Sequence, residues 1–235
     1  MNPKRTAFLL ITAAVLANVG FTALGSIFNY PDVLDEPAGQ VLASFHDHQG
    51  AVSTWFTVLA LSAGLLAPIA IGVGRLSSTR AMHIATRVGI AAAAVQVIGL
   101  MRWPILVPGY AADSVNGSAG VAAGARDSFT TASDILGTAI GETLGYLLTA
   151  TWTVLVIVAL SRRFGRWFGA LGFVSAALVA VGVLSPLNLP VVDQANFIGY
   201  VLWSVWLISF GVAMLVRERR LGTASSTVSQ AGAAS

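Results

Sequence analysis

Two charged residues, Arg102 and Glu142, fall inside long apolar stretches of the sequence. A guanidinium donates hydrogen bonds to anionic groups, and a carboxyl group can balance that charge or take up a proton. Charged side chains within a membrane-embedded segment are costly, so they face the protein interior or a water-filled cavity. We therefore predict that Arg102 and Glu142 form an ion pair within a helix bundle. In the alternative, Arg102 extends to the outer membrane interface beside Trp103, while Glu142 is protonated or bonded to threonines.

Polar residues recur at intervals of three or four around Glu142, which keeps them near one side of an α-helix. This stripe consists of Asp134, Thr138, Glu142, Tyr146, Thr149 and Thr153. A second stripe consists of Asn18, Thr22, Ser26 and Asn29. We expect the two stripes to face a common polar cavity whose ligand-binding residues are Arg102, Glu142, Gln96, Asn18, Thr138 and Tyr146. The alternative is that these groups only form hydrogen bonds between helices.

Three glycines, Gly137, Gly141 and Gly145, follow each other at intervals of four. In an apolar helix this GxxxGxxxG pattern lets a neighbouring helix approach closely. We expect this face to pack against another helix, either of the same chain or of a partner protein.

The histidines of His46-Asp47-His48 could ligate a metal ion, since imidazole is a common metal ligand. Residues two apart point in nearly opposite directions on a helix, and no third ligand has a diagnostic spacing. Solvent-exposed histidines in an outer loop are the alternative. The chain has no cysteine, its single lysine is Lys4, and no glycine-rich phosphate loop is present, so we expect no cofactor.

The composition requires a membrane setting for these residues. Of 235 residues, 56% are hydrophobic and 10% charged, whereas soluble domains carry about 25% charged residues. A water-soluble globular enzyme is thereby excluded. Six apolar runs can each cross a hydrocarbon core of about 30 Å as a helix. We predict an all-α, polytopic membrane helix bundle over residues 1–220, with a disordered tail over 221–235 and spans near 6–28, 51–73, 84–107, 134–160, 167–184 and 196–216.

Basic residues set the expected orientation. Eleven of the thirteen Lys and Arg residues lie at alternate ends of the runs, and only Arg102 and Arg126 do not. The positive-inside rule then places the N-terminus and the C-terminus in the cytoplasm. Lys4 and Arg5 before the first run also fit a signal peptide, but that run exceeds the usual apolar segment of about 7–15 residues.

The two outer connections differ in character. In the first, Val41, Leu42 and Phe45 share one helical face, which predicts a short interfacial helix. The second, residues 109–133, is rich in Gly, Ala and Ser, and we expect a long loop there.

Three segments resemble a bacterial family of multi-helix membrane proteins that is known only as a domain of unknown function. They are Gly99-Leu-Met-Arg-Trp-Pro-Ile-Leu-Val-Pro, Leu136-Gly-Thr-Ala-Ile-Gly-Glu-Thr-Leu-Gly-Tyr-Leu-Leu-Thr-Ala-Thr-Trp-Thr and Ile198-Gly-Tyr-Val-Leu-Trp-Ser-Val-Trp-Leu-Ile-Ser-Phe-Gly-Val. The resemblance implies an integral, multi-pass protein of the bacterial cytoplasmic (inner) membrane. It implies no catalytic residues and no ligand.

Three functions follow as hypotheses. The first is binding or translocation of a small molecule or lipid in a cavity near Arg102 and Glu142. The second is an accessory or sensory subunit that docks through the Gly137, Gly141 and Gly145 face. The third is an outer-face enzyme that uses His46, Asp47 and His48, and it ranks last because the sequence does not assemble an acid, a base and a nucleophile. The expected partners are the lipid bilayer, a small-molecule or lipid ligand, and a second copy or another membrane protein, whereas the absence of a basic patch excludes nucleic acid.

Overall fold

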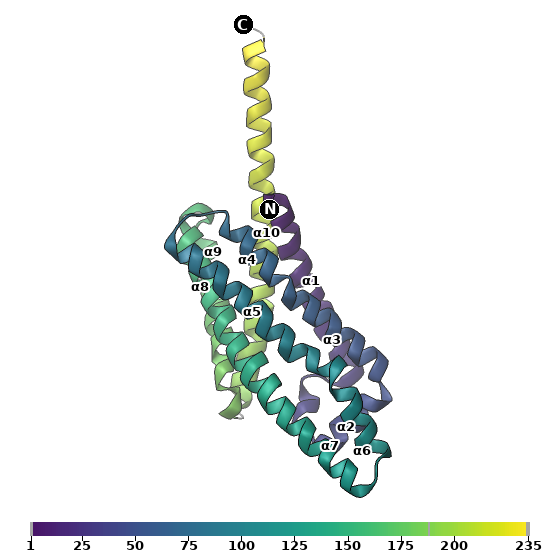
Figure 1. Cartoon of the computed structure of the whole chain (residues 1–235). Helices are drawn as coiled ribbons and strands as arrows, with labels where there is room; N and C mark the ends of the chain where they lie inside the picture. The colour runs from purple at the N-terminus through teal and green to yellow at the C-terminus, as the bar shows by residue number, and fades with distance from the viewer. Residues whose placement is uncertain (1, 188, 234–235) are drawn as a thin grey trace.

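The computed structural model describes residues 2–187 and 189–233, with the side chains of residues 190 and 221–235 left out. Every regular element in this part of the chain is helical (Figure 1). The first half contains α1 (Pro3–Phe28), η1 (Asp32–Asp35), α2 (Ala38–Asp47), α3 (Gln49–Gly64), α4 (Leu66–Gly74) and α5 (Arg80–Ile105). The second half contains α6 (Val107–Asn116), α7 (Ala119–Ala132), η2 (Ser133–Leu144), α8 (Gly145–Phe164), α9 (Arg166–Val181), η3 (Gly182–Leu187) and α10 (Pro190–Ala233).

Local sequence signals fix where several helices begin and end. The Asn2 side chain accepts a hydrogen bond from the Lys4 amide, and α1 ends at Asn29 in a left-handed conformation with φ 50°. The Thr79 side chain caps α5 by accepting from the Met82 amide. Between these ends, α1 and α5 are each 26 residues long, which is enough to cross a hydrocarbon core.

The structure confirms an all-α fold with six helices that are long and apolar enough to span a membrane. The continuous helical stretches are Pro3–Phe28, Gln49–Gly74, Arg80–Asn116, Ala119–Phe164, Arg166–Leu187 and Val191–Arg220. Each contains one predicted span, and the third and fourth run well beyond the predicted boundaries. The backbone of α10 continues to Ala233, but the side chains of the predicted tail lie outside the described residues, so its disorder stays a prediction.

The predicted long loop over residues 109–133 is instead a pair of helices, α6 and α7, joined at Gly117. Alanine is the strongest helix former, and the small residues that suggested a loop also allow the two helices to pack. A Cβ at Gly117 would collide with the Asp113 carbonyl oxygen, so the junction requires glycine. Ala122, Ala125 and Phe129 of α7 are buried.

The apolar interior has two parts. The larger lies among α1, α4, α5, α8, α9 and α10 and includes Trp152, Phe168 and Trp206, all fully buried. The smaller joins α1, α3 and α5 to the elements that we call the cap, which are η1, α2, α6 and α7. The predicted short helix is confirmed as α2, but its apolar face packs into this second core rather than lying in a membrane interface.

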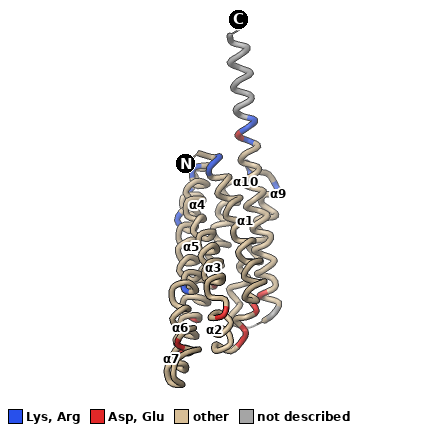
Figure 2. The backbone as a smooth tube through the Cα atoms, turned by 90° about the vertical axis from the view of Figure 1, so that its right-hand side faces the viewer, with Lys and Arg blue, Asp and Glu red and all other residues tan. Residues whose placement is uncertain are grey.

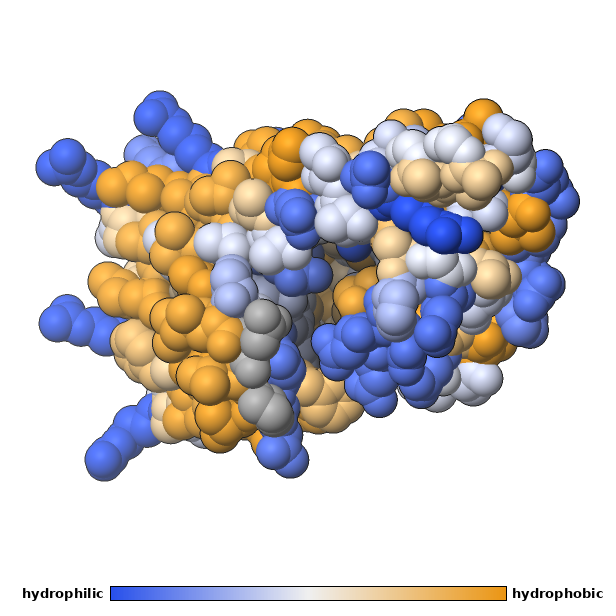
Figure 3. Space-filling model, turned by 90° about the horizontal axis from the view of Figure 1, so that it is seen from below, coloured by the Kyte–Doolittle hydropathy of each residue, from blue (hydrophilic) through white to orange (hydrophobic). Residues whose placement is uncertain are grey.

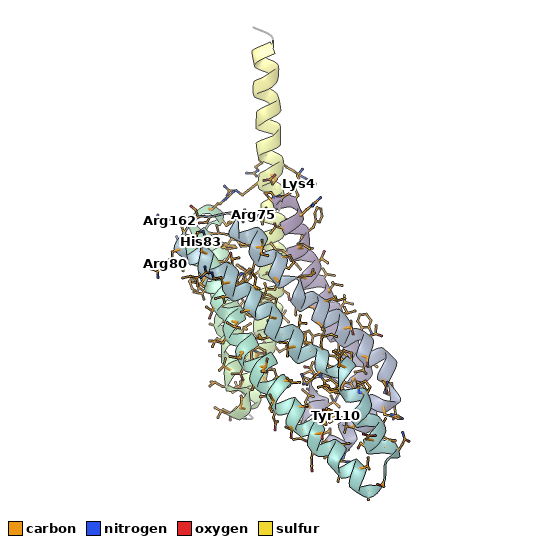
Figure 4. The ribbon with its side chains drawn as sticks, viewed as in Figure 1. Lys4, Arg75, Arg80, His83, Tyr110 and Arg162 are labelled. Atoms are coloured by element: carbon orange, nitrogen blue, oxygen red, sulfur yellow. The ribbon has the colours of Figure 1, made fainter. Side chains whose placement is uncertain are left out.

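Charge separates the two ends of the molecule (Figure 2). The N-terminus and the point where α10 leaves the bundle lie at the end where Lys and Arg gather, which we call the basic end. Figure 4 shows Lys4, Arg75, Arg80 and Arg162 at this end and Tyr110 at the opposite one. Asp and Glu gather at that opposite end, the acidic end, where the cap lies. The two termini of the bundle therefore lie on the same side of the six spans.

Candidate functional site

A cavity of about 340 Å³ lies at the acidic end, between the cap and the ends of the third and fourth spans. This volume is at the lower end of the range typical of small-molecule sites, about 300–1,000 Å³. Its lining residues are Leu34, Glu36, Ala38, Val41, Arg102, Phe129, Thr130, Ser133, Asp134, Thr138 and Glu142. Seen from below, hydrophilic residues gather around a hollow in this end of the molecule (Figure 3).

Arg102 is the most deeply buried charge of the cavity, with 7% of its surface exposed. Its Nη1 atom donates a hydrogen bond to the Gly99 carbonyl oxygen at 2.8 Å, one turn earlier in α5. Its Cζ atom lies 5.3 Å from the centre of the Trp103 ring, within range of a cation–π contact. The buried Nε atom has no hydrogen-bond partner in the described structure. The guanidinium is therefore held in place but retains donor capacity for a ligand.

The glycine face of the fourth span creates the space for this guanidinium. A Cβ at Gly137 would lie 2.7 Å from Arg102 Nη2, one at Gly141 would lie 3.1 Å from the Gly99 Cα, and one at Gly145 would lie 3.1 Å from the Gln96 Cγ. Successive glycines thus pack against successive turns of α5. The face predicted for helix packing is covered by a helix of the same chain, which leaves no room there for a helix of another protein.

The segment that carries Glu142 is not an α-helix. The twelve residues of η2 form a π-helix, which has i→i+5 hydrogen bonds and commonly marks functional sites. Glu142 follows Ser133 by nine positions, which is about two turns of a π-helix at roughly 4.4 residues per turn. In an α-helix they would span two and a half turns and point to opposite faces. The π-helix therefore brings Ser133, Thr138 and Glu142 to the same cavity wall.

The predicted ion pair between Arg102 and Glu142 is not formed. Among the described residues, no carboxylate lies within ion-pair distance of the Arg102 guanidinium, although both side chains line the cavity. The guanidinium is directed over Trp103 and Gly137 by its own turn of α5, whereas Glu142 is on the opposite helix and is half-buried. The two charges thus face a shared space, and a ligand or water can fit between them.

The predicted polar stripe of the fourth span divides where the π-helix ends. Beyond Gly145, the hydroxyl of Thr149 accepts a hydrogen bond from Gln96 Nε2 at 2.7 Å, and that of Thr153 accepts from Trp203 Nε1 at 2.8 Å. The Tyr146 ring packs edge-on against Tyr200, with centroids 5.7 Å apart. Gln96 and Tyr146 do not line the cavity. In this part of the stripe, the polar side chains form hydrogen bonds between helices, which was the alternative to a ligand-binding role.

The polar stripe of the first span does not reach the cavity either. The side chain of Asn18 is exposed on the outer surface of the bundle and donates to the Ala14 carbonyl oxygen at 2.7 Å. Thr22 and Ser26 likewise donate to carbonyl oxygens of their own helix. The expectation that the two stripes face a common cavity was therefore wrong, because the buried face of α1 is the one with Leu10, Leu24 and Phe28.

The two histidines do not assemble a metal site in the described part of the chain, where no group of three His, Cys, Asp or Glu residues has suitable positions. His46 lies in the last turn of α2, and His48 follows the helix and contacts the Ser44 carbonyl oxygen at 3.2 Å. One histidine belongs to the helix and the other follows it, so the two imidazole rings are not directed to a common point.

Four polar residues of the cavity were absent from the predicted ligand-binding set: Glu36, Thr130, Ser133 and Asp134. Asp134 was in the stripe around Glu142, so its spacing offered a signal. Thr130 lies on α7 and Glu36 in the connection between η1 and α2, and only the folding of the cap over the bundle brings them to the cavity. No sequence pattern indicated this.

Tyr30 is a further group near these charges. It follows α1, and burial raises the pKa of its phenol to about 12, with Glu142 raising and Arg102 lowering that pKa. The Tyr30 ring packs edge-on against Phe56, with centroids 5.2 Å apart. The phenol is therefore a neutral hydroxyl at physiological pH. It lies close enough to Glu142 and Arg102 for both charges to affect its pKa.

No curated protein and no solved structure matches the chain, so the comparisons supply no relative of known activity. One protein family does match, over residues 6–211, and its description is "Domain of unknown function (DUF4386)". The match covers the cap, the cavity, four spans in full and most of the first and sixth spans. With its six apolar helices and its long match to this family, the chain is a multi-pass membrane protein that belongs to the DUF4386 family.

Proposed function

We propose that this protein is an integral protein of the bacterial cytoplasmic membrane that binds the anionic group of a small molecule or lipid in the cavity at its acidic end. The observation that carries this proposal is Arg102, a buried guanidinium that lines the cavity and whose only side-chain hydrogen bond in the described structure is the one from Nη1 to the Gly99 carbonyl oxygen. A charged donor without an acceptor costs free energy, and an anionic oxygen in the cavity would accept from the guanidinium N–H groups that line it.

Other residues of the cavity support the same chemistry. Glu142 balances the charge of Arg102 when the cavity is empty and can take up a proton when an anion enters. The hydroxyl groups of Ser133 and Thr138 lie along the wall, and that of Thr130, which donates to the Arg126 carbonyl oxygen at 3.0 Å, remains an acceptor. Ser133 Oγ is buried without a hydrogen-bond partner in the described structure, so this part of the wall has an unsatisfied polar group.

The charge distribution supports a cytoplasmic basic end, because Lys and Arg flanking membrane spans are retained on that side. Both termini are then cytoplasmic, and the cavity lies on the outer side of the membrane.

This orientation is testable by cysteine labelling without background from native residues, because the chain has no cysteine. Ser128 and Ser78 are both exposed, the first on α7 of the cap and the second before α5. In spheroplasts, a membrane-impermeant maleimide should label Ser128→Cys directly and Ser78→Cys only after lysis. Labelling of Ser78→Cys from outside would reverse the orientation and place the cavity on the cytoplasmic side.

The binding proposal predicts that Arg102→Gln loses affinity for an anionic probe by about tenfold or more. A hydrogen bond to a charged group contributes about 1.5–3 kcal/mol, and a factor of ten corresponds to about 1.4 kcal/mol. The measurement is titration of the purified protein with glycerol phosphate by calorimetry, together with native mass spectrometry in detergent with phosphatidylglycerol.

Arg126→Gln is the matched control, because Arg126 lies on α7 of the same cap but bonds Ser114 and does not line the cavity. Glu142→Gln should change affinity while the protein stays folded. If Arg102→Gln does not fold, Thr138→Val and Glu142→Gln provide the test in its place. Equal binding by the wild type and all cavity variants would contradict the proposal.

A further inference from the structure

The charges around the cavity are not those of a site for a simple anion. One guanidinium, Arg102, is accompanied by three carboxylates, Glu36, Asp134 and Glu142. Arg102 is buried, Glu142 is half-buried, and the side chains of Glu36 and Asp134 are exposed at the rim. The cavity therefore changes from positive in its interior to negative at its mouth.

The interior of the cavity requires an acceptor. A guanidinium has five N–H donors, and the only hydrogen bond of the Arg102 side chain within the described structure goes to the Gly99 carbonyl oxygen. An oxygen anion is the partner that such a group binds best. A purely cationic ligand would leave this donor capacity unused and would be repelled by the guanidinium.

The mouth of the cavity disfavours a purely anionic ligand. Like charges brought together at an interface reduce affinity, and an anion on Arg102 would face the three carboxylates without compensation. An ammonium group on the same ligand would convert that repulsion into attraction. Its three N–H donors match the acceptor-only oxygens of the ionised carboxylates at the rim, Glu36 and Asp134.

We propose, building on the binding function above, that the ligand is a zwitterion that carries an oxygen anion and a primary ammonium group, such as the ethanolamine phosphate unit. The anion binds Arg102, and the ammonium group binds the carboxylates at the mouth. This unit occurs both as a phospholipid headgroup and as a free small molecule.

The same geometry predicts discrimination against choline. A trimethylammonium group has no N–H donor for the carboxylates, and sites for it rely on a cage of aromatic rings. Phe129 is the single aromatic residue lining this cavity. Ethanolamine phosphate should therefore bind better than phosphocholine, although both are zwitterions.

The test compares three soluble probes by calorimetry with the protein in detergent: phosphoethanolamine, phosphocholine and glycerol phosphate. We expect phosphoethanolamine to bind at least tenfold more tightly than the other two. In the double variant Glu36→Gln/Asp134→Asn, this preference should fall towards equality, and glycerol phosphate should bind more tightly than to the wild type. The control Asp113→Asn/Asp127→Asn, which removes two exposed cap carboxylates that do not line the cavity, should keep the preference.

A parallel set of lipid probes distinguishes a phospholipid headgroup from a free small molecule as the source of the ligand. Native mass spectrometry with phosphatidylethanolamine, phosphatidylcholine and phosphatidylglycerol should show preferential retention of the first if a lipid headgroup is bound. Preference in the soluble set alone identifies a free small molecule, and either result supports the zwitterion.

Two results separate the failure of this inference from failure of the proposed function. Binding that requires Arg102 but favours glycerol phosphate or phosphatidylglycerol would overturn the zwitterion and retain the anion site. Binding of these probes that does not depend on Arg102, or no binding of any probe in either set, would overturn both.

Discussion

Replacing Gly141 by leucine is expected to separate the third and fourth spans and to lower the free energy of unfolding by about 3 kcal/mol, the upper end of the usual cost of overpacking. A Cβ at Gly141 would lie 3.1 Å from the Gly99 Cα of α5. This is a backbone atom, which cannot rotate away, so the two helices must move apart. Denaturant titration in detergent, followed by circular dichroism, measures the loss.

Two glycine variants serve as controls for this prediction. Gly124→Leu adds the same side chain where nothing lies within 4 Å of the new Cβ, so its stability should stay near that of the wild type. Gly145→Ala meets the flexible Gln96 side chain at 3.1 Å and should have a smaller effect than Gly141→Ala. Equal stability of Gly141→Leu and Gly124→Leu would show that the close helix contact contributes nothing to folding.

Replacing Trp103 by alanine should destabilise the cap and the cavity by about 3–5 kcal/mol, the usual cost of truncating a buried aromatic residue. Trp103 is fully buried, and its ring stacks on Phe56 with centroids 4.7 Å apart. It also contacts Phe28, Phe45 and Phe129, with centroids 5.3–5.9 Å away. Because these rings come from α1, α2, α3 and α7, hydrogen exchange in α2 and α7 should increase together with the loss of stability.

Trp103→Phe separates ring packing from hydrogen bonding. The Trp103 Nε1 atom has no partner in the described structure, so this change loses no hydrogen bond and should cost much less than the alanine variant. Trp167→Ala is the control, since Trp167 is 43% exposed. If Trp103→Ala left hydrogen exchange in the cap unchanged, the aromatic cluster would not be what attaches the cap to the bundle.

The candidate site was predictable in part. Arg102, Glu142 and Thr138 were identified because charged or regularly spaced polar residues are costly in apolar segments, and all three line the cavity. Asn18, Gln96 and Tyr146 met the same criterion but do not line it. A polar side chain in a span can be satisfied by its own helix, as Asn18 is, or by a neighbouring one, as Gln96 is, and the sequence does not distinguish these outcomes from a ligand site.

The sequence by itself determined the six helical spans and the separation of charge between their ends. Both follow from properties that each segment has independently of the others, namely the length of an apolar run and the sign of the charges beside it. Only the tertiary structure decided that residues 109–133 are helices of a cap and that Glu36, between η1 and α2, lines the same cavity as Arg102 of a span. It also decided that a π-helix brings Ser133 and Glu142 to one wall. These outcomes depend on how helices pack and where their hydrogen bonding changes register, and such interactions between distant segments leave no periodic signal within any one of them.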